Sequence, residues 1–265
     1  MKNTNRAIIT TIAFLLLTPA VARAWGASGH NAIVAIAEAN LTPKARETIE
    51  KYLGGRSIVY YALWMDNVRR TPEHKQSGTW HSAEVDDKNR YSDALTREGG
   101  DVISTTEKFI SELRDYKKLP DATVALHTQF LVHMLADMHC PVHVKYTTFD
   151  VNFTITVNGN ETKFHGFWDA TIVDTHKWGY QDWVHQMNRL GKEQIAEVTA
   201  GTPRDWFNQS AQDCLVIYEW TKPGTEYKGA KYRLFLNKAL PLAESQIQKA
   251  GYRLAKVLND CFDPR

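Results

Sequence analysis

The sequence predicts a mainly α-helical protein that forms a single multi-helix domain with a small β-hairpin. Apolar residues recur at helical spacing through most of the chain, whereas only one segment alternates as a half-buried strand does. The 265 residues are 43% hydrophobic and 23% charged, which provides for a sizeable core and argues against a wholly disordered chain.

Start and stop signals delimit helices in the N-terminal half. Thr42-Pro43 forms a cap and a first-turn proline, and Gly54-Gly55 ends the helix that they begin. Asp121 is expected to cap a helix that runs to about residue 138, because Pro141 cannot continue it. Other helices are expected at residues 29–39, 60–69 and 105–116, with an irregular surface loop at 72–101.

The one clear β signal is the alternating, β-branched segment 151–157. Asn158-Gly159 favours a type I′ turn after it, and residues 162–167 are expected to form the return strand. Helical patterns resume at residues 180–190, 203–220 and 242–259. Because no repeat and no linker interrupts the chain, residues 25–265 are expected to form one domain.

Residues 1–24 have the pattern of a secretory signal peptide. Lys2 and Arg6 form a basic start, an apolar run covers residues 7–21, and Ala22-Arg23-Ala24 offers a cleavage site. The apolar run is short for a membrane-spanning anchor, which is the alternative. We therefore expect a secreted or periplasmic monomer that has no stable association with a membrane.

Cleavage after Ala24 would change the charge of the chain and expose a new amine. It leaves 29 Lys and Arg against 30 Asp and Glu, because it removes three basic residues, so the formal charge becomes −1. A polyanion would then have to be attracted by bound metal ions rather than by a basic surface. Trp25 would carry an α-amine with an unperturbed pKa of about 7.7–8.0, which can lose its proton to a metal.

The three cysteines form no C-x-x-C or other thiolate zinc pattern. In an exported protein two of them can form a disulfide. We expect Cys214 to pair with Cys261, because both lie in the C-terminal helical part, which leaves Cys140 unpaired.

The segment 130–143 carries the clearest chemical pattern. His133 and Asp137 are four residues apart on one expected helix, so both side chains share a face. Their neighbours are apolar, and a buried His–Asp pair needs partners, of which a metal ion is a strong one. A His–Asp hydrogen bond without a metal is the alternative. His139 is about 240° around the helix from His133 and is interpreted as a surface or structural residue.

A second group is expected from His143, His165 and Asp169. His143 precedes the hairpin and His165 ends it, and a hairpin returns the chain close to where it left. A His₂Asp set with an open position suits catalytic zinc. Upstream, Asp66 and Arg69 lie three apart on an expected helix, a spacing that more often marks a solvated ion pair.

Together these motifs resemble the S1/P1 nuclease family, whose relatives include the bacterial zinc phospholipases C. The resemblance runs in order through the whole chain after residue 24 and implies the phospholipase C/P1 nuclease type of helical domain. The matching motifs are Trp25 with His30, Trp64-x-Asp66-x-x-Arg69, Trp80-His81, His133-x-x-x-Asp137, Pro141-x-His143 and His165-x-x-x-Asp169.

The resemblance implies three zinc ions. The implied ligands are Asp66, His81, His133 and Asp137 for the first ion, His143, His165 and Asp169 for the second, and the Trp25 amine and carbonyl, His30 and the shared Asp137 for the third. Imidazole and carboxylate ligands suit zinc. The ions would keep the site electropositive although the mature chain is not.

The activity implied by the resemblance is hydrolysis of single-stranded RNA or DNA to 5′-phosphorylated nucleotides, together with 3′-nucleotidase activity. Two close zinc ions would activate a water, and the remaining ion would stabilise the departing 3′-oxygen. Asp66 would orient the water, and Arg69 would hold a phosphate oxygen. Single strands are favoured because an unpaired base can enter a pocket and stack.

The positions that contact the base in this family are altered here. An aromatic residue usually follows the loop histidine, with Asp or Asn two residues later, but this chain has Ser82 and Glu84. Ser82 cannot stack, so either the base preference is altered or another aromatic such as Tyr146 or Phe149 provides the stacking surface. Of the usual Gly-Gly-Asn loop only Asn152 remains, and we keep it as a sugar contact.

Other functions remain open beside the nuclease. A zinc phospholipase C has the same metal core but needs an apolar lipid site, and the loss of an aromatic at Ser82 slightly favours it. A non-catalytic metal-binding protein is disfavoured by the complete ligand set and by Arg69. A helical di-iron oxidase would need paired Glu-x-x-His motifs, which are not found among these clusters. No role in the site is expected for His74, His127, His176 and His185.

Overall fold

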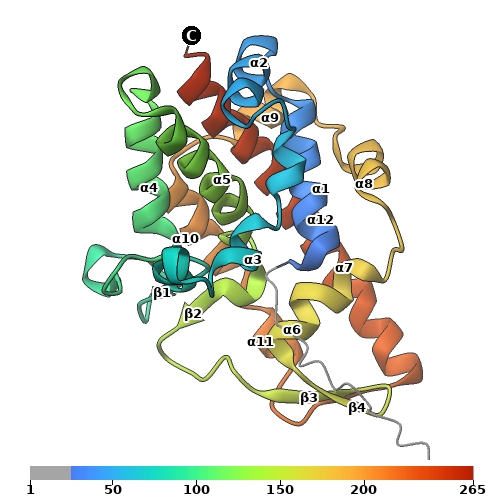
Figure 1. Ribbon diagram of the computed structural model, residues 1–265. Helices are drawn as coiled ribbons and strands as arrows, with labels where there is room; N and C mark the ends of the chain where they lie inside the picture. Colours follow the sequence, from blue (N-terminus) through green and yellow to red (C-terminus); the bar gives the residue numbers. More distant parts are fainter. Residues whose placement is uncertain (1–24, 265) are drawn as a thin grey trace, which may run out of the picture.

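The computed structural model describes residues 25–264, so the predicted signal peptide lies outside the described residues. The mainly α-helical fold with a small hairpin is confirmed. A long helix, α12 (Gly229–Phe262), packs along α1 (Gly26–Ala39) and α5 (Asp121–Asp137) through the middle of the molecule (Figure 1). Within residues 25–264, no helix is both long enough and apolar enough to cross a membrane.

The remaining helices surround these three, with α4 and α8 near opposite edges of the view in Figure 1. The other α-helices are α2 (Pro43–Tyr52), α3 (Trp64–Val68), α4 (Val102–Leu113), α6 (Phe164–Gly166), α7 (Ile172–Asp174), α8 (Tyr180–Met187), α9 (Lys192–Val198), α10 (Pro203–Cys214) and α11 (Ile217–Trp220). The short 3₁₀ helices are η1 (Ile58–Tyr61), η2 (Pro72–Thr79), η3 (Asp93–Leu95), η4 (Tyr116–Lys118) and η5 (Pro141–His143), and η6 (Phe167–Thr171) is a π-helical turn.

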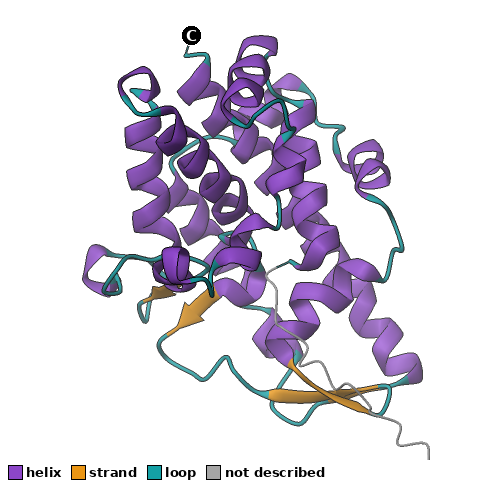
Figure 2. Ribbon diagram, viewed as in Figure 1, coloured by secondary structure: helices purple, strands orange, loops and turns teal. Residues whose placement is uncertain are grey.

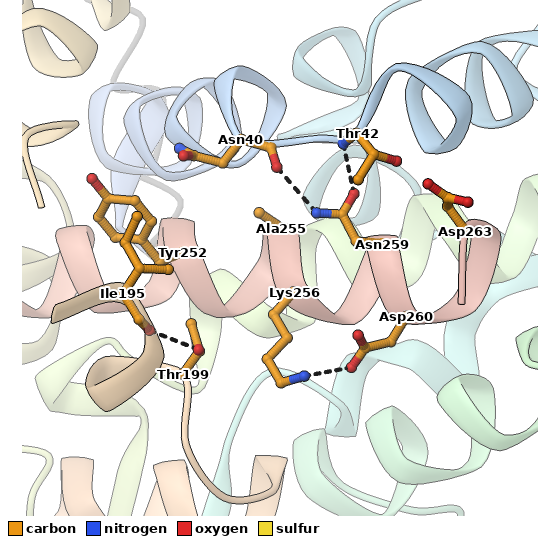
Figure 3. Close-up of a pocket in the computed structure, with 10 residues that line it drawn as sticks. All are labelled: Asn40, Thr42, Ile195, Thr199, Tyr252, Ala255, Lys256, Asn259, Asp260 and Asp263. Carbon is orange, nitrogen blue, oxygen red and sulfur yellow. Dashed lines mark hydrogen bonds and ion pairs between the residues drawn. The ribbon is translucent and has the colours of Figure 1, made fainter. Parts of the chain in front are cut away.

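Helices α1 and α12 approach closely and are held at one end by a side chain. A Cβ atom at Gly251 would lie 2.5 Å from Cγ2 of Ile36, so a larger residue would push the two helices apart. Asn259 donates to the Asn40 carbonyl at 3.0 Å and accepts from the Thr42 amide at 2.9 Å, beside a pocket of about 420 Å³ (Figure 3). These contacts hold the turn between α1 and α2 against α12.

Helix boundaries follow the expected signals in part. The Thr42 hydroxyl accepts from the Ala45 amide at 3.1 Å and caps α2 as predicted. The helix expected at residues 60–69 is divided into η1 and α3, and between them the Ala62 carbonyl accepts from His133 Nδ1 at 2.8 Å. The last helix is expected to begin near residue 242. It begins at Gly229 instead, and Pro241 lies within it.

The predicted hairpin is formed by β3 (Thr154–Val157) and β4 (Asn160–Lys163). Asn158 and Gly159 have φ angles of 49° and 84°, as a type I′ turn requires. The return strand does not reach residue 167, because α6 begins at residue 164 and places His165 on a helical turn. The hairpin lies at one end of the molecule in Figure 2.

Two further strand pairs are not predicted by the alternation of apolar residues. The short strand β5 (Glu226–Tyr227) adds in parallel to β3. Strand β1 (Ala83–Val85) pairs in parallel with β2 (Val144–Tyr146). The β1–β2 pair ties the segment after His81 to the segment after His143.

The expected disulfide between Cys214 and Cys261 is not formed. All three cysteines lie in the described part of the chain and are buried free thiols. Cys261 contacts the Ile110 carbonyl on α4, whereas Cys214 lies close enough to Lys249 to be influenced by its charge. Lys249 and Cys261 are twelve residues apart on α12, about 18 Å along the axis, so the two thiols occupy different parts of the core.

Candidate metal centre

The carboxylate of Asp137 lies at the centre of a buried cluster of histidines. Asp137 is the last residue of α5 and has no exposed surface. Its Oδ2 lies 2.7 Å from His81 Nδ1 and 3.3 Å from His133 Nε2. Its Oδ1 lies 3.2 Å from His30 Nε2 and 3.5 Å from His143 Nδ1. One carboxylate therefore gathers imidazoles from α1, from the loop before β1 and from the segment 130–143.

Asp66 approaches the same cluster from α3. Its Oδ2 lies 4.0 Å from His133 Nε2, and its Oδ1 lies 3.6 Å from Arg69 Nη1. The ligand atoms of Asp66, His81 and His133 all lie within 4.8 Å of one another, as in a group that could hold a metal ion. The guanidinium of Arg69 thus lies at the edge of a candidate metal-binding group.

A second group surrounds Asp169. Its Oδ2 lies 2.9 Å from His165 Nε2, and its Oδ1 lies 3.7 Å from His143 Nε2. The two imidazole rings stack with their centroids 5.1 Å apart, so the hairpin does bring His143 and His165 together. The Cys140 thiol donates to Asp169 Oδ1 at 3.2 Å. The atoms of Cys140, His143 and Asp169 form a further group that could hold a metal ion.

Trp25 is packed beside both groups. It is fully buried, and its indole Nε1 donates to the Ala136 carbonyl at 3.1 Å. Its main chain lies against the Cys140 thiol. Gly26 has a φ of 50°, and a Cβ there would lie 3.1 Å from the Asp169 carbonyl, so glycine is required for this close approach. The start of α1 therefore enters the cluster.

Main-chain carbonyls orient two of the imidazoles toward Asp137. His30 Nδ1 lies 3.1 Å from the Gly26 carbonyl, and His133 Nδ1 lies 2.8 Å from the Ala62 carbonyl. Each contact engages Nδ1 with a carbonyl and directs Nε2 toward the carboxylate, so Nε2 is the nitrogen that would bind a metal. The rings stack with their centroids 4.1 Å apart. Both imidazoles are thus preorganised to bind a metal through Nε2.

Eight atoms of ligand type in this cluster are buried and have no hydrogen-bond partner. They are His30 Nε2, Asp66 Oδ1 and Oδ2, His81 Nε2, His133 Nε2, Asp137 Oδ1, His143 Nδ1 and Asp169 Oδ2. Leaving a buried polar atom unsatisfied costs about 1–3 kcal/mol. Bound cations would satisfy the nitrogen and oxygen atoms together, and this donor set fits zinc.

Burial and mutual charge set the protonation of the cluster. Burial opposes the charged form of His133, but Asp137 and Asp66 outweigh it and raise the pKa of His133 to about 9. Burial likewise opposes the Asp137 carboxylate, but His133 and His143 hold its pKa well below the usual range. Burial lowers the pKa of His81 and His143. Asp137 is therefore ionised and these last two imidazoles neutral, the forms that bind a metal.

The expected base contacts Ser82 and Glu84 are both engaged by Arg97. Arg97 Nη1 donates to Ser82 Oγ at 3.3 Å, and its Nε lies 3.5 Å from Glu84 Oε1. Asn152 is exposed in the loop before β3, where its main-chain N–H donates to Asp150 Oδ1 at 2.7 Å. Arg97 is far enough along an irregular loop that sequence spacing could not place it beside Ser82.

Cys140 is the residue of the cluster to which the sequence pattern assigned no role. Its contact with Asp169 Oδ1 places a thiol beside a carboxylate of the candidate centre. The pKa of the thiol is raised well above its ordinary value by burial and by the charge of Asp169. Its place between Asp137 and His143 in the sequence is the signal that could have identified it.

His139 is a structural residue and does not lie on the surface. It is fully buried, its Nδ1 lies 2.8 Å from the Leu135 carbonyl, and its Nε2 accepts from Arg253 Nη1 at 2.9 Å. Burial and the neighbouring Arg253 charge hold the pKa of His139 well below its usual value. Its partner is on α12, in agreement with the predicted direction away from His133.

Replacing Cys140 with Ala is expected to weaken metal binding at the Asp169 group. The thiol holds one carboxylate oxygen, and loss of such a supporting contact typically costs about 10–100-fold in metal affinity. Cys140→Ser keeps a donor and should lose less. Competition with a chromophoric chelator measures the affinity, and Cys214→Ala removes a buried thiol outside the cluster as a matched control. Unchanged affinity in Cys140→Ala would contradict this role.

This chain is similar to known proteins over most of its length. Residues 25–263 match the family model described as S1/P1 Nuclease. The chain is 24% identical to Nuclease P1 of Penicillium citrinum, with 89% of this chain and 97% of that protein covered. It is 25% identical to Nuclease S1 of Aspergillus oryzae, with coverages of 89% and 91%, and 23% identical to Endonuclease 2 of Arabidopsis thaliana, with 96% of both covered. The chain therefore belongs to the S1/P1 nuclease family.

Proposed function

We propose that this protein is a zinc-dependent phosphodiesterase that hydrolyses single-stranded RNA or DNA to 5′-phosphorylated nucleotides and also acts as a 3′-nucleotidase. Membership of the S1/P1 nuclease family supports nuclease activity on a nucleic-acid substrate. The observation that carries the proposal is the convergence of eight buried, unpaired ligand atoms around Asp137 and Asp169. A donor set that is assembled in advance suits metal-assisted hydrolysis.

The cluster divides into three ligand sets for zinc. We assign Asp66, His81, His133 and Asp137 to the first, His143, His165 and Asp169 to the second, and the Trp25 amine and carbonyl, His30 and the shared Asp137 to the third. The contacts of Asp137 with both His30 and His81 support its sharing between the first and third sets.

The side chains around these sets have separate tasks. When bound, zinc would supply Lewis-acid catalysis and a water of lowered pKa. Asp66 would accept a hydrogen bond from the attacking water and orient it toward phosphorus. Arg69, close to that carboxylate, would donate to a phosphate oxygen and spread the charge of the transition state. The water oxygen would bond to phosphorus as the bond from phosphorus to the 3′-oxygen breaks; the proton lost by the water balances the one taken up by the 3′-oxygen, and the phosphate stays on the 5′-oxygen of the next nucleotide.

We also propose that residues 1–24 are removed during export, which makes the protein secreted or periplasmic. The family match begins at Trp25, the first residue after the predicted cleavage site. The Trp25 main chain lies against the Cys140 thiol, and this thiol contacts Asp169. A freed α-amine at this place would add a nitrogen ligand, so cleavage would complete the third ligand set.

The test uses protein that is expressed through a secretion pathway, so that processing can occur. Mass spectrometry gives the N-terminus, plasma emission spectroscopy gives the metal content, and hydrolysis is followed on single-stranded RNA, single-stranded DNA and a 3′-mononucleotide. About three zinc ions per chain and chelator-sensitive release of 5′-phosphorylated products are expected. Zinc without nucleolysis, or hydrolysis of phosphatidylcholine instead, would reject the nuclease assignment.

Replacing Arg69 with Ala is expected to lower kcat without loss of metal. Removal of one donor to a developing negative charge typically costs roughly 10²–10³-fold in kcat. Arg69→Lys should recover part of the rate, because it restores the charge but not the bidentate geometry. Arg70→Ala is the matched control, because Arg70 is the next residue in the chain and its side chain is exposed. Equal rates for Arg69→Ala and Arg70→Ala would remove Arg69 from the mechanism.

A further inference from the structure

The two positions after His81 that usually contact a base in this family, Ser82 and Glu84, are paired with Arg97 in this chain. Ser82 offers no ring, and both Ser82 and Glu84 contact the guanidinium of Arg97. A base that approached these positions would meet an ion pair instead of a π-face. If a base stacks near the candidate centre, it must use a different aromatic surface.

Of the two aromatic residues proposed from the sequence, only Phe149 is accessible. Tyr146 is 4% exposed, and its hydroxyl donates to the Ala211 carbonyl at 2.7 Å. Phe149 is 37% exposed, and its ring stacks on Tyr146 with centroids 5.1 Å apart. It also meets the edge of Tyr218 at 5.0 Å. Phe149 is therefore a supported aromatic ring with solvent access.

Phe149 lines a pocket of about 420 Å³. The apolar wall of this pocket is formed by Phe149, Phe153, Leu215 and Tyr218, and the polar residues at its boundary are Asp150, Glu219, Thr221 and Lys222. Flat aromatic walls with few polar groups suit the face of a planar ring.

The pocket is joined to the candidate metal centre through its aromatic wall. Tyr218 is 5% exposed, its hydroxyl is buried without a hydrogen-bond partner, and its ring packs edge-on against Phe164 with centroids 5.5 Å apart. On the other side, Phe153 stacks on Phe164 at 4.7 Å, and Phe164 directly precedes His165. The stacked rings of Phe153 and Phe164 thus connect the pocket to the second ligand set.

We propose that this pocket binds a nucleobase of the single-stranded substrate, which stacks on Phe149 while the scissile phosphate lies at the metal centre. This inference rests on the proposed nuclease function and adds a base subsite that Ser82 and Glu84 do not provide. The phosphodiester backbone would run from the pocket toward the metal centre. Stacking alone reads no base edge, so the subsite tolerates any base that is unpaired.

Phe149→Ala tests the subsite. With zinc-loaded protein, we expect the Kd of a phosphorothioate single strand and the KM of a normal strand to rise about 5- to 150-fold, the range for loss of one stacked base. Phe149→Trp should restore binding. Hydrolysis of an abasic strand should be equal in wild type and Phe149→Ala, because that substrate has no ring to stack. Tyr180→Ala removes another exposed aromatic, on α8, as a control.

The outcomes separate this inference from the proposed function. If wild type cleaves single strands and Phe149→Ala keeps the wild-type KM and Kd, the subsite is rejected and the nuclease function stands. An equal loss on abasic and normal strands would also reject stacking. If wild type cleaves no strand but hydrolyses phosphatidylcholine, with activity lowered by Phe149→Ala, the pocket holds an acyl chain and both proposals fail.

Discussion

Asp137→Asn is expected to remove more than one metal ion per chain and to abolish most hydrolysis of single-stranded DNA. Both carboxylate oxygens of Asp137 face imidazoles, with His30 and His143 near Oδ1 and His81 and His133 near Oδ2. Asn keeps the shape but loses the charge and one acceptor. Metal catalysis supplies several kcal/mol of transition-state stabilisation, so the rate should fall roughly 10³-fold or more.

A graded set of variants separates this effect from a loss of fold. Asp66→Asn changes only the group of Asp66, His81 and His133 and should lose activity but keep more metal than Asp137→Asn. Asp115→Asn removes an exposed carboxylate that pairs with exposed Lys118 and should change neither quantity. Circular dichroism checks the fold, and plasma emission spectroscopy counts the metal. Wild-type metal content in Asp137→Asn would refute a shared ligand at this position.

Removal of the metal ions is expected to lower Tm by at least roughly 8–16 °C, the shift for a single ion. One ion present at a thousand times its Kd stabilises the folded state by about 4 kcal/mol, and each kcal/mol moves Tm by about 2–4 °C in a domain of comparable size. The loss has a structural cause, because the eight buried atoms without partners would lose the cations that satisfy them. Differential scanning calorimetry before and after dialysis against a chelator measures the shift.

Restoring single metals to the chelated protein provides the control. Zinc should recover both Tm and activity, whereas Mg²⁺ at equal concentration should recover neither, because it prefers oxygen ligands and this centre is rich in imidazole. A protein that is verified to be metal-free and yet keeps its full Tm would show that the buried histidines are satisfied without metal. The metal-free His–Asp alternative would then hold.

The relations that were predictable from the sequence are those within one or two turns of a helix. His133 and Asp137 are four residues apart, as are His165 and Asp169, and each pair lies within 3.3 Å in the structure. The repeat of 3.6 residues per turn produces this proximity for the first pair, on α5, and the second pair spans α6 and the π-helical turn η6, where one turn still brings the two side chains together. The turn at Asn158-Gly159 is equally local, because only residues that tolerate positive φ form it well.

The family resemblance extended the prediction across the chain, because ordered motifs indicate which distant segments belong to one site. It could not describe departures from the family. The engagement of Ser82 and Glu84 by Arg97 and the contact of Cys140 with Asp169 depend on this chain alone. The same holds for the burial of Tyr146, which leaves Phe149 as the accessible ring.

Contacts between segments far apart in the sequence could not be predicted from local spacing, because the packing of the whole core determines them. The expected Cys214–Cys261 bridge illustrates this, since both residues lie in the C-terminal helices and yet contact different neighbours. Asp137 illustrates the opposite result, because α1, α5 and the β1–β2 pair bring His30 and His81 to one carboxylate. Helix periodicity determines how side chains within one turn, about 5 Å of helix, are oriented. The distances between segments far apart in the sequence depend instead on how many elements pack together. Side-chain spacing therefore determines each half of the candidate centre, and tertiary packing determines that the halves meet.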